Sequence, residues 1–433
     1  MLSDSDNELL CRVGAGTPMG ELMRQYWIPA VRADELPSAD CPPVRIKLLG
    51  EELIAFRATS GDVGLIRNSC PHRGASLFFG RNEEEGLRCV YHGWKFDVTG
   101  ACVDMPSEPA ESNFRTKVRA RSYPTHERNG IIWTYMGPRE VPPPLPQIEA
   151  FLLNEGPQAV SVLHRPCNWM QGWEGEMDTV HAAFLHGGQN TSDEYEPGSF
   201  NYYQYKQRAA RFSTIETEFG LSNGAFRPAE DDTYYWRVTH ILFPFYNMIP
   251  TGKLGEGVRI GIYVPMDDDH TLHWEISVTP GVERTEPFFL RYSHAVPNTS
   301  GWYGRFNVEE TLENDYLIDR ELQASNKGIG GYTGIKNGRL QDCAVTETMG
   351  TIYDRSHEHL GTTDQFIITA RRRMIRAARA LEQGITPPGV DNPEVYRQRS
   401  GEMILPRTQD WWQAYLNTRA QMTPLETLVA AGR

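Results

Sequence analysis

Two short motifs, each combining one cysteine with one histidine, constrain the fold of this 433-residue chain more than any other feature. Cys70 and His72 form the first motif, with one residue between them. Cys89 and His92 form the second, with two residues between them, and residues 73–88 connect the two motifs. Two loops that each offer one thiolate and one imidazole can hold a single metal ion or a small metal cluster. The chain must therefore fold so that these two loops face each other.

The mixture of ligand types within each loop distinguishes two kinds of metal site. Zinc ribbons and zinc fingers usually pair cysteine with cysteine and histidine with histidine. In a Rieske [2Fe–2S] centre, two histidines replace two cysteines on one iron, which raises the reduction potential of the cluster. The mixed loops therefore favour a Rieske centre with the ligands Cys70, His72, Cys89 and His92, and a Cys2His2 zinc site is the alternative.

The sequence around these loops predicts how the chain divides into domains. Short apolar or alternating runs begin at Val44 and are separated by Gly, Asp and Pro, which is typical of a compact antiparallel β domain. A hairpin turn is expected at residues 97–100. The proline-rich segment 137–146 predicts a stiff connector between two domains. We therefore expect an α+β chain with an N-terminal helical segment at residues 1–40, a β domain at 41–140 and a larger domain at 146–433.

Within the larger domain, helical and strand patterns alternate with polar segments. The expected elements are helices at residues 168–186, 302–326 and 363–383, strands within 211–280, and loops at 187–204 and 328–341. A further short helix should begin at Pro18 and end before Pro29. The arginine run of the helix at 363–383, from Arg371 to Arg379, predicts a solvated face, with docking of a reductase as the alternative.

A second group of candidate ligands lies in the segment 168–186. Asp178, His181 and His186 follow the pattern D-x2-H-x4-H. On a helix, Asp178 and His181 share one face, so that the carboxylate can orient the imidazole. His186 lies about 140° further round an ideal helix, so we expect the helix to loosen near the glycines that follow it. This pattern is not HExxH, which disfavours a zinc protease.

Two histidines and one distant carboxylate form the facial triad of non-haem Fe(II) oxygenases. The alternative for a pair of histidines on a lone helix is an ordinary, partly buried pair. The Rieske motif favours the iron site, because a one-electron donor complements an iron that activates O₂.

Charge and hydropathy exclude several classes of function. Lysine and arginine number 43 against 56 aspartates and glutamates, which gives a net charge of −13. Nucleic-acid binding is not expected, because it requires clustered cations. No run approaches the ~20 apolar residues of a membrane span, and the first residues lack the basic, apolar pattern of a secretory signal. The seven cysteines are too few and too scattered for a disulfide framework. We expect a cytoplasmic protein that does not enter membranes.

Longer stretches around both motifs resemble one family. The runs CPHRGASLFFGR, YHGWKFDVTGACVDMPSEP, EGEMDTVHAAFLH and QDCAVTETMGTIYDRSHEHLG are similar to the oxygenase component of Rieske non-haem iron oxygenases, specifically the phthalate 4,5-dioxygenase-like branch. The resemblance implies a Rieske domain followed by a catalytic domain of the helix-grip type, an antiparallel sheet with helices. It also supplies Asp342 as the third iron ligand, which spacing alone does not choose over Asp315, Asp319, Glu347 or Asp354. One departure from several ring dioxygenases is Glu174, where they have asparagine.

The same resemblance implies partners and a reaction. Asp178 would link a mononuclear-iron histidine to a Rieske histidine of the neighbouring chain in a head-to-tail homotrimer. Electrons would come from NADH through a separate reductase that carries FMN and a [2Fe–2S] cluster, since this chain has no GxGxxG before a helix. The expected reaction is hydroxylation of a carboxylated aromatic ring with O₂. The alternative is O-demethylation of a methoxylated aromatic acid, such as the biaryl 5,5'-dehydrodivanillate, and a remote alternative is a non-catalytic electron carrier.

Candidate substrate residues follow from the chemistry of an aromatic acid. A carboxylate that enters a protein of this net charge needs a local cation, and Arg227, Arg237 and Arg259 lie in the strand region expected around the iron. Apolar walls could come from Met170, Phe184, Phe243, Phe245, Tyr246 and Met248, for each of which the alternative is an ordinary core position.

Overall fold

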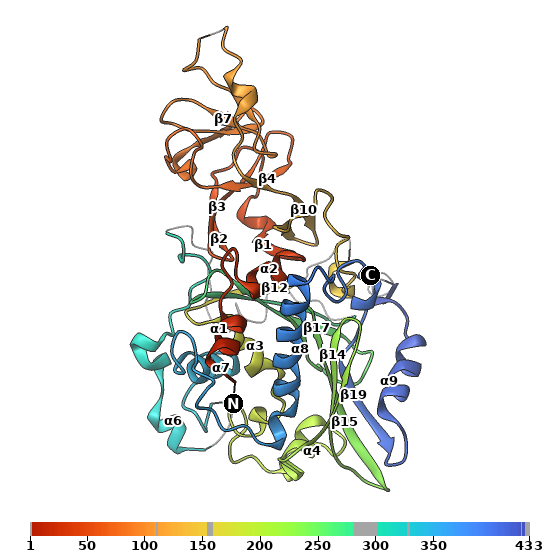
Figure 1. Cartoon of the computed structure of the whole chain (residues 1–433). Coiled ribbons are helices and arrows are strands. Elements are labelled where there is room, and N and C mark those ends of the chain that lie inside the picture. Colours follow the sequence, from red (N-terminus) through yellow and green to blue (C-terminus); the bar gives the residue numbers. More distant parts are fainter. Residues whose placement is uncertain are drawn as a thin grey trace.

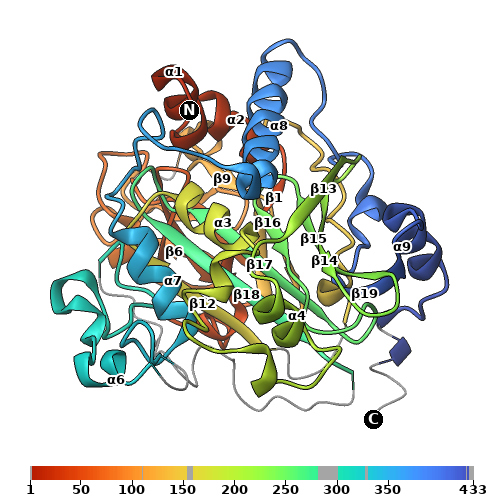
Figure 2. The same cartoon turned by 90° about the horizontal axis from the view of Figure 1, so that it is seen from below.

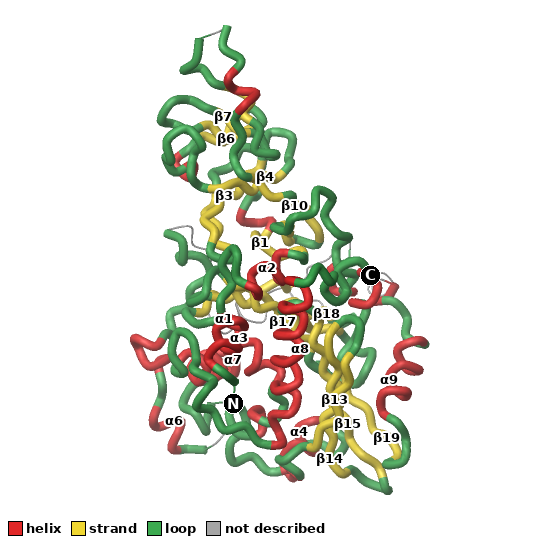
Figure 3. The backbone as a smooth tube through the Cα atoms, in the orientation of Figure 1, coloured by secondary structure: helices red, strands yellow, loops and turns green. Residues whose placement is uncertain are grey.

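The computed structural model has a small β domain at one end and a broad sheet-and-helix body at the other (Figure 1). It describes residues 2–109, 111–153, 159–280, 301–326, 330–425 and 427–428. In this part of the chain, none of the helices combines the length and apolar composition that crossing a lipid bilayer requires. The tube view shows that loops and strands dominate the small domain and that helices gather in the body (Figure 3).

Two four-stranded antiparallel sheets build the small domain, in the orders β2-β3-β4-β9 and β5-β6-β7-β8. The strands are β2 (Val44–Leu48), β3 (Glu51–Arg57), β4 (Val63–Arg67), β5 (Arg81–Glu83), β6 (Gly86–Arg88), β7 (Lys95–Phe96), β8 (Cys102–Asp104) and β9 (Ser122–Tyr123). Burial alternates along β2, as expected for a strand with one face on a core. Ile54, Phe56, Leu87 and Phe96 belong to a separate apolar core of this domain. The expected β domain is confirmed, including the turn in which Gly100 donates its N–H to the carbonyl of Asp97.

A three-stranded sheet, ordered β1-β11-β10, lies between the small domain and the body. Its strands are β1 (Trp27–Arg32), β10 (Thr125–Arg128) and β11 (Ile131–Tyr135). Two short helices precede it, α1 (Asp4–Cys11) and α2 (Pro18–Arg24). The helix expected from Pro18 is confirmed, although it ends at Arg24 and a strand follows. The N-terminal segment packs on the body, since the carbonyl of Leu10 accepts a hydrogen bond from the indole of Trp169.

An eight-stranded antiparallel sheet forms the centre of the body, ordered β12-β18-β17-β16-β15-β14-β13 with β19 also paired to β15. The strands are β12 (Ala159–Arg165), β13 (Arg211–Glu216), β14 (Gly220–Pro228), β15 (Thr233–Leu242), β16 (Tyr246–Met248), β17 (Val258–Pro265), β18 (Thr271–Val278) and β19 (Gly401–Pro406). The helices are α3 (Trp169–Met177), α4 (Phe200–Lys206), α6 (Arg320–Ala324), α7 (Gly338–Glu347), α8 (Gln365–Glu382) and α9 (Trp411–Ala420). Figure 2 shows α3 in front of the middle strands with α7 beside it, and α3 contacts both β16 and β17.

Several element boundaries differ from those expected. The helix predicted at 168–186 ends at Met177, where Asp178 takes an extended conformation. The predicted loop at 187–204 contains the beginning of α4, and the predicted loop at 328–341, of which 328–329 lie outside the described residues, contains the beginning of α7. In segment 302–326 only two short helical turns form. Polar side chains cap both missed helices, because Ser199 and Asn337 accept hydrogen bonds from their first N–H groups.

The helix predicted at 363–383 is confirmed as α8, but the prediction of a uniformly solvated arginine face is wrong. Arg371 is 3% exposed and pairs with the carboxylates of Glu174 and Glu358. Arg376 and Arg379, further along the same helix, have about half of their side chains exposed and pair with carboxylates at the surface. Only one arginine of the run therefore enters the core, and it does so because a buried carboxylate faces it.

Candidate metal centres

The two cysteine–histidine loops of the small domain have the same backbone conformation. The carbonyls of Cys70 and Cys89 each accept an N–H from the glycine four residues later, Gly74 and Gly93, at 2.9 Å. Each cysteine N–H also donates to the carbonyl five residues further along, at 2.8 Å. Both glycines have positive φ, +77° and +79°, which residues with a Cβ rarely adopt. The loops thus form a matched pair that presents one thiol and one imidazole from each side.

The side chains pair by type rather than converging on one point. The thiols of Cys70 and Cys89 are buried and interact with each other, and the rings of His72 and His92 lie 4.4 Å apart. Nδ1 of His72 is buried and has no hydrogen-bond partner among the described residues, as a free ligand atom would. Among the described residues, no three of these four ligand atoms lie within 4.8 Å of one another. A single tetrahedral zinc would draw them closer, so the arrangement fits a two-iron cluster with two thiolates at one iron and two imidazoles at the other.

Aromatic side chains contact both imidazoles. The indole of Trp94 stacks on His72 with ring centroids 4.3 Å apart and is 3% exposed. The ring of Tyr91 lies 3.9 Å from that of His92 and is 55% exposed. One imidazole is therefore covered by a buried ring, whereas the other lies beside the surface, where an electron donor can approach.

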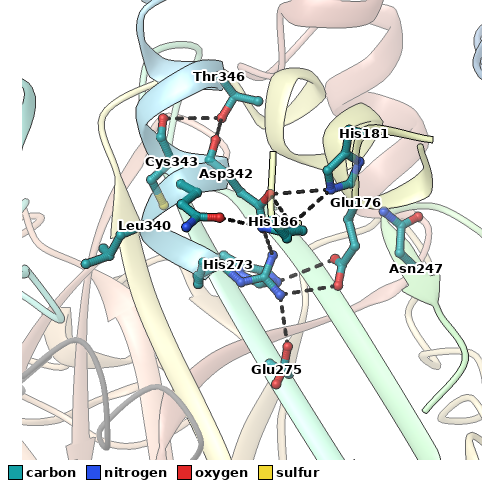
Figure 4. A network of polar contacts seen from close by, with 12 residues as sticks. Glu176, His181, His186, Asn247, His273, Glu275, Leu340, Asp342, Cys343 and Thr346 are labelled. Carbon is teal, nitrogen blue, oxygen red and sulfur yellow. Dashed lines mark hydrogen bonds and ion pairs between the residues drawn. The ribbon is translucent and has the colours of Figure 1, made fainter. Parts of the chain in front are cut away.

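The second site brings together His181, His186 and Asp342, as Figure 4 shows. Oδ1 of Asp342 lies 3.5 Å from Nε2 of His181 and 3.2 Å from Nε2 of His186, and the two Nε2 atoms are 3.2 Å apart. This is the one group of three or more His, Cys, Asp or Glu side chains in the described ranges whose ligand atoms all lie within 4.8 Å of one another. Two imidazoles and one carboxylate on one side of a metal leave coordination positions open, which is the facial triad of non-haem iron.

A break in the chain before His181 makes this convergence possible. Asp178 caps the end of α3, and its Oδ1 accepts the N–H of Val180 at 2.7 Å. His181 then begins a separate 3-10 turn. The helix therefore breaks before the first histidine, and not at the glycines after His186 as expected. Oδ2 of Asp178 lies 3.9 Å from Nδ1 of His181, which is too long for a hydrogen bond.

Buried charges surround the carboxylate ligand. Burial alone would raise the pKa of Asp342, but His181, His186 and Arg339 hold it well below its usual range. Arg339 stands one helical turn before Asp342 on α7, and its guanidinium lies 3.6 Å from Oδ2 of that residue. Arg339 also contacts the buried carboxylates of Glu275 at 3.0 Å and Glu176 at 3.5 Å. The carboxylate of Asp342, the candidate ligand, is thus ionised and contacts Arg339 through Oδ2, while Oδ1 faces the histidines.

A cavity of about 270 Å³ adjoins the triad. Arg237 of β15 and Arg259 of β17 line it, together with Phe200 of α4 and Ile249. Phe200 and Ile249 were not predicted, because nothing in the sequence indicates that the start of α4 lies over the sheet. The side chain of Arg237 lies over the ring of Phe200, 4.1 Å from its centroid.

The structure does not bring the other predicted substrate residues into this cavity. Arg227 is fully buried and its Nε donates to the carbonyl of Gln207. Phe184 is 47% exposed and packs under Arg208. Phe243 lines a different, much smaller cavity beside Trp27. The remaining predicted wall residues are buried core positions: Met170, Phe245, Tyr246 and Met248.

Glu174, where the sequence departs from several ring dioxygenases, belongs to a buried ion cluster behind α3. Its carboxylate pairs with Arg355 at 3.1 Å and with Arg371 at 2.7 Å. Burial alone would raise the pKa of Glu174, but these two arginines hold it below its usual value. This ion cluster ties α3, which ends at Met177 just before Asp178, to α8 and to the segment after α7.

Comparisons with known proteins agree with this geometry. Residues 26–124 match the model of the Rieske [2Fe-2S] domain, and residues 134–429 match the LigXa C-terminal domain like family. The chain is 44% identical over 434 residues to the 3-chlorobenzoate-3,4-dioxygenase oxygenase subunit of Comamonas testosteroni, covering 96% of this chain and 98% of the relative. It is 35% identical to the phthalate 4,5-dioxygenase oxygenase subunit of Pseudomonas putida, covering 95% and 94%. It is 31% identical to the 5,5'-dehydrodivanillate O-demethylase oxygenase subunit of Sphingobium sp. (strain NBRC 103272 / SYK-6), covering 90% and 84%.

Solved structures support the fold. Dicamba monooxygenase bound to dicamba matches with a TM-score of 0.53 at 18% identity, over 83% of this chain and 98% of that one. The predicted fold class, an all-β Rieske domain followed by an antiparallel sheet with helices, is confirmed. Such oxygenases use a Rieske cluster and a non-haem Fe(II), with electrons supplied by a reductase. The chain belongs to the Rieske non-haem iron oxygenases, in the phthalate dioxygenase-like branch, and is an oxidoreductase.

Proposed function

We propose that this chain is a terminal oxygenase that hydroxylates a single-ring aromatic acid. The observation that carries the proposal is that Arg237 and the triad His181, His186 and Asp342 line the same cavity. The guanidinium of Arg237 lies in a cavity lined by both polar and apolar side chains and offers a fixed binding position for a carboxylate. The aromatic ring of the acid would then extend toward the triad.

Of the two arginines in the cavity, Arg237 is the better partner for a substrate anion. Nε and Nη2 of Arg259 both bond to the carboxylate of Glu275, so its charge is already matched within the protein. Nη1 of Arg237 lies 3.7 Å from Glu402, beyond hydrogen-bond distance. Burial lowers the pKa of Arg237, which indicates that its charge is incompletely compensated. A bound carboxylate would complete the pairing.

The volume of the cavity favours one ring over two. Ligand pockets for drug-sized molecules span about 300–1,000 Å³, and this cavity, at about 270 Å³, lies just below that range. Phe200, at the start of α4, is one of the residues that line it. The segment after His186 thus contributes a wall to the cavity, which leaves less room for a biaryl acid. The 44% identity to a chlorobenzoate dioxygenase subunit supports the same substrate class.

In the proposed assignment, His181, His186 and Asp342 hold Fe(II), and Cys70, His72, Cys89 and His92 hold the [2Fe–2S] cluster. When both are bound, the iron activates O₂ and the cluster supplies electrons one at a time. Asp178 stands beside His181 at the surface end of α3, with 27% of its side chain exposed. From there it can reach a Rieske histidine of a neighbouring subunit.

The elongated shape of the chain favours transfer between subunits. The cluster loops lie in the small domain at one end of the molecule, and α3 and α7, which frame the triad, lie in the body (Figure 1). We therefore propose a head-to-tail homotrimer. Its electron donor would be an NADH-dependent reductase with FMN and a [2Fe–2S] cluster, which places the system in the cytoplasm, where NADH is regenerated.

O-demethylation of a methoxylated aromatic acid is the second candidate, because a relative at 31% identity carries that name and the metal residues serve both reactions. A panel of single-ring acids, their methoxylated analogues and biaryl acids separates the two, with NADH oxidation, O₂ consumption and products measured in the presence of a reductase. Diol formation from benzoate- or phthalate-type acids supports ring hydroxylation. Formaldehyde release from methoxylated acids, with no diol from any acid, would show that the reaction is O-demethylation and not ring hydroxylation. A protein with two irons per chain, or none, and no O₂ consumption would refute both.

A further inference from the structure

The two histidines of the triad are held in different ways. Nδ1 of His186, on the side of the ring that faces away from the triad, lies 2.7 Å from Oε1 of Gln341. Nδ1 of His181 is buried and makes no hydrogen bond within the described residues. The Asp178 carboxylate faces it from 3.9 Å. One imidazole is therefore fixed by a direct hydrogen bond inside the chain, and the other is not.

The amide of Gln341 can take only one orientation in this environment. Its Nε2 donates to the carbonyl of Ile335 at 2.6 Å, and the side chain is almost completely buried, with 1% exposure. Because a carbonyl only accepts, the nitrogen of the amide must face Ile335 and the oxygen must face His186. A flipped amide would place an N–H against Nδ1 and an oxygen against the carbonyl oxygen of Ile335.

This orientation decides which nitrogen of His186 carries the proton. An amide oxygen accepts, so Nδ1 of His186 must be the protonated nitrogen. In the neutral ring the lone pair is then on Nε2, the atom that lies 3.2 Å from Oδ1 of Asp342 and 3.2 Å from Nε2 of His181. Partners of this kind on the far side of a ligand imidazole fix its tautomer and ring orientation.

We propose that Gln341 is a positioning residue that sets the tautomer and the angle of His186 and thereby the affinity of the triad for Fe(II). The inference rests on the ligand assignment of the proposed function. In this proposal α7 contributes to the iron site through two residues. Asp342 offers a ligand oxygen, and Gln341 orients His186, which lies on another segment. Glutamine suits this position because one amide both accepts from His186 and donates to the segment before α7. Leucine can do neither, and an ionised glutamate can only accept.

The chain offers a matched control in a second buried glutamine. Gln171 of α3 is 2% exposed, and its Nε2 donates to the carbonyls of Thr346 and Gly350, both at 2.8 Å. It ties α3 to the C-terminal end of α7, yet it touches none of the triad side chains. Replacing this amide also removes two buried hydrogen bonds of a glutamine Nε2 to carbonyls, but His186 is not among its partners.

The test compares Gln341→Leu, Gln341→Glu and Gln171→Leu in the full chain. Anaerobic Fe(II) titration of the emptied mononuclear site, in competition with a chelator, measures iron affinity, and the urea unfolding transition of the body, followed by tryptophan fluorescence, reports that the body is folded. We expect Gln341→Leu to bind Fe(II) about 10–100-fold more weakly, as for other partners of ligand imidazoles. Gln341→Glu, which retains the acceptor, should fall between the wild type and the leucine variant, and Gln171→Leu should match the wild type. The visible bands of Co(II) bound at the site should shift in Gln341→Leu alone.

Two results would overturn the inference: an unchanged Fe(II) affinity in Gln341→Leu, or an equal loss in Gln171→Leu. If Gln341→Leu lacks a cooperative unfolding transition of the body and so does not fold, Gln341→Glu decides. An affinity of Gln341→Glu as weak as that of Asp342→Ala would then contradict the role of the acceptor. A wild-type chain that binds no third iron would instead refute the ligand assignment itself, so the two failures are distinguishable.

Discussion

The two candidate metal centres are built in opposite ways. The four cluster residues lie within residues 70–92, on two loops closed by their own backbone hydrogen bonds and packed on a core that belongs to the small domain. The triad combines a broken helix end with a helix that comes about 160 residues later in the chain, counting from His181 to Asp342. Buried ion pairs with still other segments hold these parts together, Arg339 with Glu275 of β18 and Arg371 of α8 with Glu174. A centre made by one short segment should survive damage elsewhere, whereas an assembled centre should depend on distant contacts.

The strongest test of this separation removes each centre in turn. We expect Cys70→Ser to eliminate the visible Rieske absorption and Asp342→Ala to eliminate mononuclear iron, and each variant alone should have no oxygenase activity. If electrons pass between subunits, trimers reassembled from equal amounts of the two variants should recover about one quarter of the wild-type activity, by random pairing around a closed ring. Activity is measured as the rate of product formation per chain.

The control is a mixture of each variant with a doubly substituted chain, which should stay inactive. Mixed trimers that form but remain inactive would show that the cluster and the iron of one chain work together. Rieske absorption that persists in Cys70→Ser would mean that the cluster ligands are misassigned.

Electron transfer between the two centres should be lost on substitution of Asp178 while both metal centres stay intact. Asp178→Asn keeps the side-chain oxygen that accepts the N–H of Val180, so the end of α3 should form normally. We expect both metal centres to remain occupied, the reductase to reduce the cluster at the normal rate, and coupled turnover to be abolished. Single-turnover oxidation of the reduced cluster, followed by stopped-flow absorption, measures the missing step. Coupled turnover at the wild-type rate would contradict the bridging role of Asp178.

Glu174 tests whether the assembled site depends on the buried ion cluster behind it. Removing one member of a buried ion pair typically costs about 3–5 kcal/mol, and Glu174→Gln would leave Arg355 and Arg371 without their shared carboxylate. The variant should lower the free energy of unfolding of the body by about this amount, measured in urea by tryptophan fluorescence. Glu216→Gln is the control, because its pairing with Arg376 is at the surface and should contribute about 0–1 kcal/mol. Equal decreases in the free energy of unfolding would show that the buried ion pairs of Glu174 stabilise the body no more than the surface pair of Glu216.

The same carboxylate predicts a pH dependence. Because the folded protein holds the pKa of Glu174 below its usual value, its stabilising contribution is present above the unfolded pKa, near 4.5. It is lost as the pH falls through the lower folded value. The free energy of unfolding should therefore decrease less steeply with acidification in Glu174→Gln than in the wild type. Parallel pH profiles would exclude this origin of acid sensitivity.

How well each centre could be predicted from sequence follows from the same difference. The cluster ligands and both triad histidines lie in short motifs with fixed spacing, so their residue types alone indicate the chemistry. Asp342 required the family resemblance, because several other acidic residues stand at comparable positions along the chain. The break before His181 was missed because Asp178 suits a helix interior by spacing, while its side chain caps the following turn instead. Arg371 resembles its neighbours in sequence, and its burial follows from carboxylates elsewhere in the chain, Glu358 and Glu174, the latter 197 residues away.

Substitution of Arg237, the proposed partner of the substrate carboxylate, should have the smallest effect on activity of these changes. It tests whether the triad cavity also recognises the acid. A hydrogen bond to a charged group contributes roughly 1.5–3 kcal/mol, a factor of about 10–150. We expect Arg237→Gln to raise the KM for a benzoate-type acid by that factor, with smaller changes in kcat. Arg237→Lys should recover part of the loss, since a charge remains without the planar fork. The methyl ester of the same acid provides the internal comparison, because it lacks the anion and should be oxidised equally by wild type and Arg237→Gln. An equal loss for acid and ester would mean that Arg237 shapes the cavity through its contact with Phe200, and the carboxylate partner would then have to be sought at Arg259.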